Sequence, residues 1–317
     1  MDNKLHISVS PHIHRKRSTT GIMLDVIIAL LPATIAGIVL SAINSGDVLV
    51  AVNAVAIIVT CVATSVVAEV LFNLITKKKQ TIGDLSCIVT GLLLALNLSV
   101  GTPLWQVALG AIFAVVIVKC LFGGIGKNLV NPAVTGRVFM LVAFASLADD
   151  AVDATAGATP LGLLAEGAED KMPQLMDLLI GTSGGAIGET CRVALLVGGL
   201  YLLVRKVISW HIPVAFMGTV FVLSFLLKGF DAEVALAYVL SGGLVLGAIF
   251  MATDYTTSPR TALGKLVFGI GAGVITVVIR FWGAYPEGVS FAILLMNIVN
   301  PLICSLGSRK LFGGAKK

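Results

Sequence analysis

Long apolar stretches separated by short polar breaks dominate the chain and fall into two groups. Five lie before residue 148 and five after residue 189. Most approach the roughly 20 residues that a helix needs to cross a bilayer, so the pattern predicts ten membrane-spanning helices in two sets of five. The predicted spans are 22–43, 48–75, 85–100, 104–122 and 130–147, followed by 190–204, 212–227, 233–252, 265–282 and 288–305.

The long polar segment 148–189 joins the two sets and divides the chain. A polar segment, 1–21, precedes the first set (22–147), and a basic tail, 306–317, follows the second (190–305). With 57% hydrophobic and 12% charged residues, the chain is typical of an all-α integral membrane protein and unlike a soluble domain. The polar start is followed by no small-residue cleavage site, so we expect no removable signal peptide.

Lysine and arginine indicate the orientation, since cytoplasmic loops are rich in both. If the N-terminus is cytoplasmic, 16 of the 22 lie in cytoplasmic segments and only Lys171 and Lys228 lie in outer loops. We therefore expect both termini in the cytoplasm of a bacterium or archaeon and the acidic segment 148–189 outside its inner membrane. The net charge of +5 is spread over the cytoplasmic loops, which argues against a nucleic-acid partner.

The five cysteines stand singly in or beside predicted spans and form no CxxC pair of the kind that holds zinc or an iron–sulfur cluster. We interpret them as packing residues. An iron–sulfur ligand shared with another subunit stays open, and no bound metal is predicted.

Three short matches between the halves indicate an internal repeat. Each copy has an odd number of spans, so the second copy must enter the membrane from the opposite side. Inverted repeats place their sites near mid-membrane, where short or broken helices expose helix ends and carbonyl groups. The matches are Ala95–Pro103 with Met251–Pro259, Gly110–Lys119 with Gly271–Arg280, and Val130–Pro132 with Val299–Pro301.

Polar residues inside spans are costly in lipid and often functional. Asp25, Glu69, Arg137 and Asp254 lie within or beside predicted spans. Most are near a membrane interface, where snorkelling or a local ion pair is the simpler explanation.

Asn131 and Asn300, each followed by a proline, are stronger candidates. Proline lacks a backbone donor and disfavours helix at the preceding residue, so we expect Asn131-Pro132 and Asn300-Pro301 to unwind and face each other across the repeat axis. With Asp254, they would form a polar site near mid-membrane. The alternative, that each Asn-Pro pair only starts or kinks its helix, is equally well supported.

The polar segment contains Gly157-Ala158-Thr159-Pro160, which presents a hydroxyl beside small residues. No His or Cys stands nearby to make Thr159 a nucleophile, and an ordinary turn is the simpler explanation of these four residues alone. No catalytic residue is predicted.

The longer stretch from Asp153 to Thr159 resembles the flavinylation motif Asp-x-x-Ser/Thr-Gly-Ala-Thr, with Ala156 where Ser or Thr is usual. The chain resembles the D subunit of the Rnf electron-transport complex and, more distantly, the B subunit of the sodium-translocating NADH:quinone reductase. The other stretches that carry this resemblance are Ser10–Ile13, Ser18–Thr19, Asp25–Pro32, Asn131–Ala133, Gly185–Thr190, Trp210–Val214 and Met251–Asp254.

The resemblance implies FMN linked through its phosphate to Thr159, with Asp153, Gly157 and Ala158 completing the attachment motif, and a noncovalent riboflavin within the spans. Asn131-Pro132, Asn300-Pro301 and Asp254 would bind this second flavin or lie beside the ion path. It implies a complex that carries electrons between ferredoxin and NAD and pumps Na⁺ or H⁺, in which this subunit does not bind the nicotinamide. The flavins would supply the redox chemistry and the protein their positions. The implied partners are membrane subunits A and E, soluble or peripheral subunits B, C and G, and a flavin transferase.

Two other interpretations stay open. A solute channel or secondary transporter also uses inverted repeats with unwound segments, although it has no reason to carry the flavin motif. The B subunit of the quinone reductase is the alternative within the family, and its longer N-terminal part favours the Rnf subunit for this chain.

Overall fold

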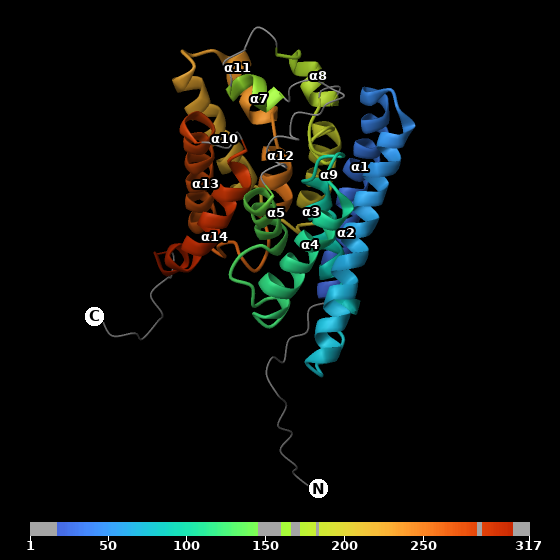
Figure 1. Ribbon diagram of the computed structural model, residues 1–317. Helices are drawn as coiled ribbons and strands as arrows, with labels where there is room; N and C mark the ends of the chain where they lie inside the picture. The colour runs from blue at the N-terminus through green and yellow to red at the C-terminus, as the bar shows by residue number, and fades with distance from the viewer. Residues whose placement is uncertain (1–17, 145–159, 166–171, 182–183, 284–286, 307–317) are drawn as a thin grey trace, which may run out of the picture.

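The computed structural model describes residues 18–144, 160–165, 172–181, 184–283 and 287–306. Helices and their connections account for this part of the chain, which contains no strand, as the apolar pattern predicts (Figure 1). Thr159 and the rest of the proposed attachment motif, Asp153, Gly157 and Ala158, lie outside the described residues.

The helices follow the two predicted sets. The first set is α1 (Thr19–Ser45), α2 (Val48–Ile75), α3 (Ser86–Leu96), α4 (Leu104–Ile112) with its π-helical continuation η2 (Phe113–Cys120), and α5 (Pro132–Ala143); the 3-10 turn η1 (Ile82–Asp84) precedes α3. The second set is α9 (Arg192–Val204), α10 (His211–Leu227), α11 (Ala232–Leu240), α12 (Leu244–Leu246) with the π-helix η4 (Gly247–Met251), α13 (Ala262–Trp282) and α14 (Val289–Leu306). The short helices α7 (Pro160–Ala165) and α8 (Leu175–Ile180) lie between the sets.

Each of the ten predicted spans corresponds to a helix or a bent helix pair. By length and composition, α1, α2 and α13 are able to cross a membrane, and α11 with α12 and η4 forms a fourth such segment, bent by 66°. The other six spans match apolar helices of 10–17 residues. The third spans are short or broken: α3 has only 11 residues, and its counterpart breaks at Ser241–Gly243.

Helix α1 shows how side chains are sorted in these spans. Its buried face carries small or polar residues such as Ala29, Ala33 and Gly37. Large apolar residues point outward, among them Ile35 at 60% exposure and Ile43 at 65%. Small residues at helix contacts and large apolar residues outside are the arrangement that lipid favours, so the structure supports a multi-pass membrane protein.

The packing repeats between the halves. In the first, α2 packs on α3 and α4, and in the second α10 packs on α11 and α13. A Cβ atom on Gly110 would overlap Met140 Sδ, and one on Gly271 would lie 2.8 Å from Met296 Sδ. The same two glycine–methionine contacts therefore join the fourth and fifth spans of both halves, which supports the internal repeat.

A second repeated feature is a buried cation near the end of the fourth span. Lys119 Nζ donates to Ser86 Oγ at 2.6 Å, and Arg280 donates to the main-chain oxygen of Ser241 at 3.0 Å. Ser86 begins α3 and Ser241 begins the break before α12. The predicted match of Lys119 with Arg280 therefore has a structural counterpart.

The two halves meet where α1 crosses α9. A Cβ atom on Gly198 would overlap the carbonyl oxygen of Ala29, so the main chains of the two helices are in direct contact. Glycine is needed at this crossing because any side chain would separate the helices.

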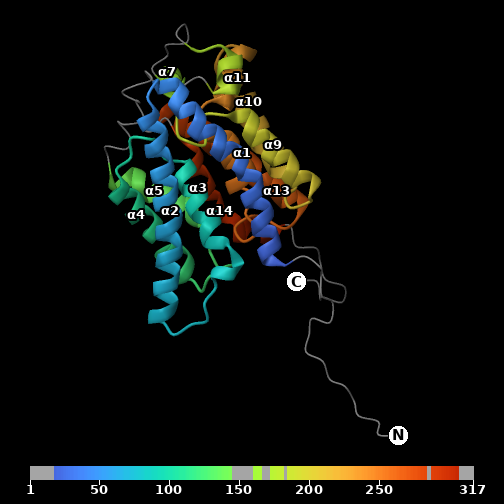
Figure 2. The same cartoon turned by 90° about the vertical axis from the view of Figure 1, so that its right-hand side faces the viewer.

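The helices between the two sets lie at one end of the molecule. Figure 2 shows α7 and α11 at the end opposite the start of α1. Tyr238 Oη in α11 donates to Leu164 O in α7, and α8 packs on α9 and α11. We call this the α7/α8 end.

Candidate functional site

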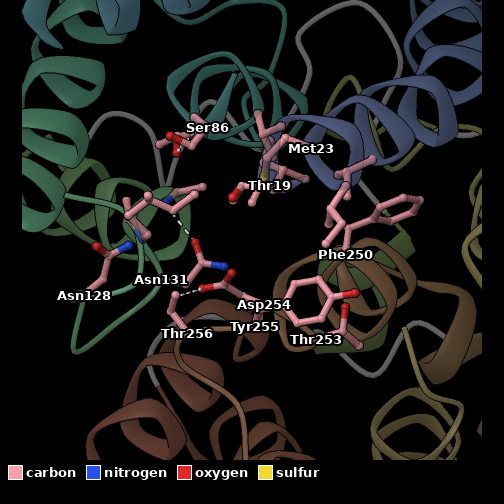
Figure 3. A pocket seen from close by; sticks show the side chains of 18 of the residues that line it. Thr19, Met23, Ser86, Asn128, Asn131, Phe250, Thr253, Asp254, Tyr255 and Thr256 are labelled. Carbon is pink, nitrogen blue, oxygen red and sulfur yellow. Dashed lines mark hydrogen bonds between the residues drawn. The ribbon is translucent and has the colours of Figure 1, made fainter. Parts of the chain in front are cut away.

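A cavity of about 380 Å³ opens between the two halves. Its volume lies within the usual range for a small-molecule site, roughly 300–1,000 Å³. Its walls come from α1, α3, the residues before α5, the end of α9 and the segment around η4 (Figure 3). The polar side chains in these walls include Asn128, Asn131, Thr253, Asp254 and Thr256.

Asn131 joins the two halves at this cavity. Its Oδ1 accepts from the main-chain nitrogens of Ala133 (3.0 Å) and Val134 (3.4 Å), which makes it the N-cap of α5, with Pro132 in the first turn. Its Nδ2 donates to the carbonyl of Met251, at the end of η4 in the other half (3.0 Å). Asn131-Pro132 therefore starts its helix, as the alternative interpretation predicts, and the Asn131 side chain both caps that helix and contacts the opposite half.

Asp254 lies beside Asn131 in Figure 3. Its Oδ2 accepts from Thr256 Oγ1 (2.7 Å) and Thr257 Oγ1 (3.1 Å). Burial raises the pKa of the Asp254 carboxyl, and the hydrogen bonds from Thr256 and Thr257 oppose that rise. The structure therefore brings Asn131 and the Met251–Asp254 segment together at one cavity.

Asn300 does not take part in this arrangement. It lies inside α14, with Pro301 also within the helix, and its Oδ1 accepts from Cys304 Sγ. The expectation of an unwound segment at Asn300 is wrong, and Asn300 is not among the residues that line the cavity. The α14 residue that reaches Asn131 is Asn297. In the amide orientation that satisfies both of its ends, its oxygen accepts from Asn131 N (3.1 Å) and its nitrogen donates to Thr257 O (3.2 Å).

Asn128, which no sequence pattern singled out, also lines the cavity. Its Oδ1 is buried and has no hydrogen-bond partner within the described residues. A buried acceptor without a donor costs roughly 1–3 kcal/mol, so this oxygen is suited to an N–H or O–H group of a bound molecule.

Apolar and aromatic side chains form most of the remaining wall, including Met23, Leu93, Leu202 and Phe250. Tyr255 adds an aromatic ring, which its hydroxyl fixes by donating to Val207 O. A mostly apolar cavity with a few convergent polar groups is typical of a cofactor site.

The charged residues expected within spans are mostly paired. Glu69 Oε2 accepts from Lys119 Nζ at 2.8 Å, with both side chains 2% exposed. Asp25 accepts from Arg205 (3.0 Å) and Tyr201 (3.1 Å). These contacts support the interpretation as local ion pairs. Lys119 also lines the cavity, but its charge is matched by Glu69.

The fourth residue, Arg137, forms an ion pair with Glu287 (3.1 Å), which lies just before α14. Glu287 also accepts from Ser290 Oγ (3.0 Å). This pair joins α5 to the opposite half. Neither residue lines the cavity described above.

Residues 6–313 match the protein family described as NQR2, RnfD, RnfE. The chain is 43% identical to the D subunit of the Na⁺-translocating ferredoxin:NAD⁺ oxidoreductase complex of Acetobacterium woodii, over 98% of this chain and 96% of that protein. It is 38% identical to the D subunit of the proton-translocating complex of Clostridium ljungdahlii, over 95% and 94% respectively. The B subunit of the Na⁺-translocating NADH-quinone reductase of Ectopseudomonas mendocina is 43% identical over 74% of this chain and 62% of that protein.

Proposed function

Because the chain belongs to the NQR2, RnfD, RnfE family, we propose that it is the D subunit of an ion-translocating ferredoxin:NAD⁺ oxidoreductase complex and carries electrons on two flavins. FMN is attached to Thr159, and an uncharged flavin binds in the cavity between the repeats. The partners are subunits A, B, C, E and G and, during maturation, a flavin transferase. Bound flavin supplies one- and two-electron redox chemistry, and this chain supplies its position.

The cavity suits a flavin without a phosphate. Its polar groups offer what a flavin ring edge or ribityl chain needs: the unpartnered acceptor of Asn128 and the carboxyl of Asp254. The cation in its wall, Lys119, is already paired with Glu69. A phosphate would meet the Asp254 carboxyl without a compensating charge among the lining residues, which disfavours FMN and favours riboflavin.

This proposal rests on one observation: Asn128 Oδ1, in the cavity between the two halves, has no hydrogen-bond partner within the described residues. Asn128→Leu keeps the side-chain size but removes both polar atoms, and we expect it to lower the flavin released on denaturation. Asn131→Asp keeps the cap on α5 but loses the donor to Met251 O, and should have the same effect. In both variants the covalent flavin should persist in a denaturing gel.

Asn300→Leu is the matched control, since Asn300 lies outside the cavity. We expect its releasable flavin to equal that of the wild type. If Asn128→Leu and Asn131→Asp also retain full releasable flavin, the second flavin is not bound here. If the wild-type protein carries no flavin of either kind, the transporter interpretation gains support.

A further inference from the structure

A second polar cluster lies at the break between α11 and α12, outside the flavin cavity. A Cβ atom on Gly243 would lie 2.9 Å from Glu189 Oε1 and 3.6 Å from both Asn97 Oδ1 and Glu287 Oε1. These three oxygens are the nearest atoms to that point beyond the local chain. Three acceptor oxygens from distant segments therefore converge beside Gly243.

Main-chain hydrogen bonds hold the cluster together. Ile187 N donates to Leu98 O at 3.0 Å, and Gly188 N donates to Leu96 O at 2.8 Å. This pairing joins the unwound end of α3 to the segment that leads into α9. Gly188 permits the approach, because a Cβ atom there would lie 2.7 Å from Leu96 Cβ.

Asn97 directs its oxygen into the cluster. The residue is 2% exposed, and its Nδ2 donates to Leu93 O (2.7 Å) and approaches Met251 Sδ (3.6 Å). Among the described residues, no donor reaches Oδ1. A buried amide with its donor end satisfied and its oxygen unpaired is an incomplete site.

The charged neighbours do not fill this space. Arg192 donates to the main-chain oxygens of Leu240 (2.7 Å) and Leu178 (2.6 Å). Arg280 donates to those of Tyr238 and Ser241, and Arg137 is bound to the other oxygen of Glu287. Ser290 Oγ donates to Glu287 Oε1 at 3.0 Å, which leaves one lone pair of that oxygen for a ligand. The described structure contains no side-chain hydrogen bond from these guanidinium groups to Glu189.

Lone pairs on three converging oxygens repel one another unless a positive charge or donor lies between them. Carboxylate and carbonyl oxygens are also the ligands that hard cations prefer, and unwound segments in inverted repeats hold Na⁺ or H⁺. We propose that Glu189, Glu287 and Asn97 bind one monovalent cation, a proton or Na⁺, at the α7/α8 end of the repeat interface.

Burial and the Glu287 carboxylate raise the pKa of Glu189 to about 7, and Arg137 and Arg192 oppose this rise. The native state therefore holds a proton at Glu189 that the unfolded chain releases at lower pH. The stability that this proton contributes is fully present below the pKa of Glu189 in the unfolded chain, and it is lost as pH rises towards 7.

The test uses Gly243→Ala and Glu189→Gln in the full-length protein. Gly243 has a φ of −76°, a conformation that alanine adopts without strain, so the new methyl occupies the cation space. Gly218→Ala is the matched control, since a Cβ atom there meets nothing within 4 Å. Thermal unfolding is followed from pH 5 to 8 in NaCl and in choline chloride at equal ionic strength.

If the cation is Na⁺, NaCl raises the Tm of the wild type and of Gly218→Ala. In Glu189→Gln and Gly243→Ala, the apparent affinity for Na⁺ falls at least roughly tenfold. If it is a proton, the wild-type Tm falls between about pH 5 and pH 7 without sodium dependence, and Glu189→Gln removes that fall. The proposal is overturned if the wild type shows neither response or if Glu189→Gln and Gly243→Ala retain it.

The same variants in the assembled complex separate this site from the flavin proposal. We expect unchanged covalent and releasable flavin together with a loss of ion uptake during ferredoxin-dependent NAD⁺ reduction. Unchanged uptake would reject a role for the site in transport, and loss of flavin would show that the cluster supports a cofactor instead.

Discussion

Replacing Lys119 with methionine tests the most deeply buried ion pair in the described structure. Lys119 and Glu69 are each 2% exposed and 2.8 Å apart. Lys119→Met leaves the Glu69 carboxylate buried with Thr81 Oγ1 as its remaining hydroxyl donor. Removing one partner of a buried pair costs about 3–5 kcal/mol, a large part of the stability of an ordinary domain.

The assay is unfolding of the detergent-solubilised protein by denaturant, with the double variant Lys119→Met/Glu69→Gln completing a double-mutant cycle. The double variant carries no buried charge at this point, so most of the lost stability should return. Arg205→Met is the comparison, because Arg205 is 52% exposed and solvent screens its pair with Asp25, so this variant should lose much less stability.

The reasoning is refuted if the double variant is as unstable as Lys119→Met. It is also refuted if Lys119→Met costs no more than Arg205→Met, because burial would then not govern the strength of the pair. Lys119 lies in the cavity wall, so releasable flavin should be measured on the same samples.

Two further predictions concern the segment between the repeats. Thr159→Val should abolish the fluorescent flavin band in a denaturing gel at an unchanged protein level, because valine lacks the hydroxyl. If the band survives, FMN is attached to another residue, and Thr155 is the next candidate. A cysteine that replaces Ala168 should react with an impermeant thiol reagent in intact cells faster than the unsubstituted chain does. The distribution of lysine and arginine predicts that this segment lies outside the cell membrane. Labelling only after lysis would contradict the ten-span topology.

The order and type of the helices could be predicted because lipid imposes a simple rule on the sequence. Breaks such as Asn44–Asp47 and Gly101–Pro103 are short and polar, and the helices end there. The sequence did not reveal the bend at Ser241–Gly243, since the surrounding residues are apolar and continue the hydrophobic pattern. Its 66° angle falls at Ser241-Gly242-Gly243, where Gly242 has a φ of +67°, a left-handed conformation that glycine adopts readily and that interrupts a helix.

The fourth-span match predicted a real equivalence, whereas the Asn-Pro match in the fifth span did not. An inverted repeat pairs the start of α5 with the start of α14, as the contacts of Met140 and Met296 with Gly110 and Gly271 indicate. Asn131 lies at the start of its helix and Asn300 near the end. Three identical letters were therefore too few to set the register.

Half of the candidate cavity was predictable and half was not. Asn131 and Asp254 could be selected because polar groups beside spans are rare and because proline marks the unwound residue. Asn128 and Asn297 showed no such signal, since their importance depends on which atoms the fold brings near them. The proposed cation site combines residues that are far apart in sequence, since at least 92 residues separate Asn97 from Glu189 and Glu189 from Glu287. Their convergence depends on the tertiary fold.

The crossing of α1 and α9 limits how the two halves move relative to each other. At Gly198 the main chains touch, so no side chain there is able to change rotamer and absorb a displacement. A rocking motion of one half against the other would have its smallest amplitude at the crossing of α1 and α9 and its largest at the helices farthest from that crossing. The hydrogen bond from Asn131 to the carbonyl of Met251 would then resist that motion, because it joins the two halves at the cavity.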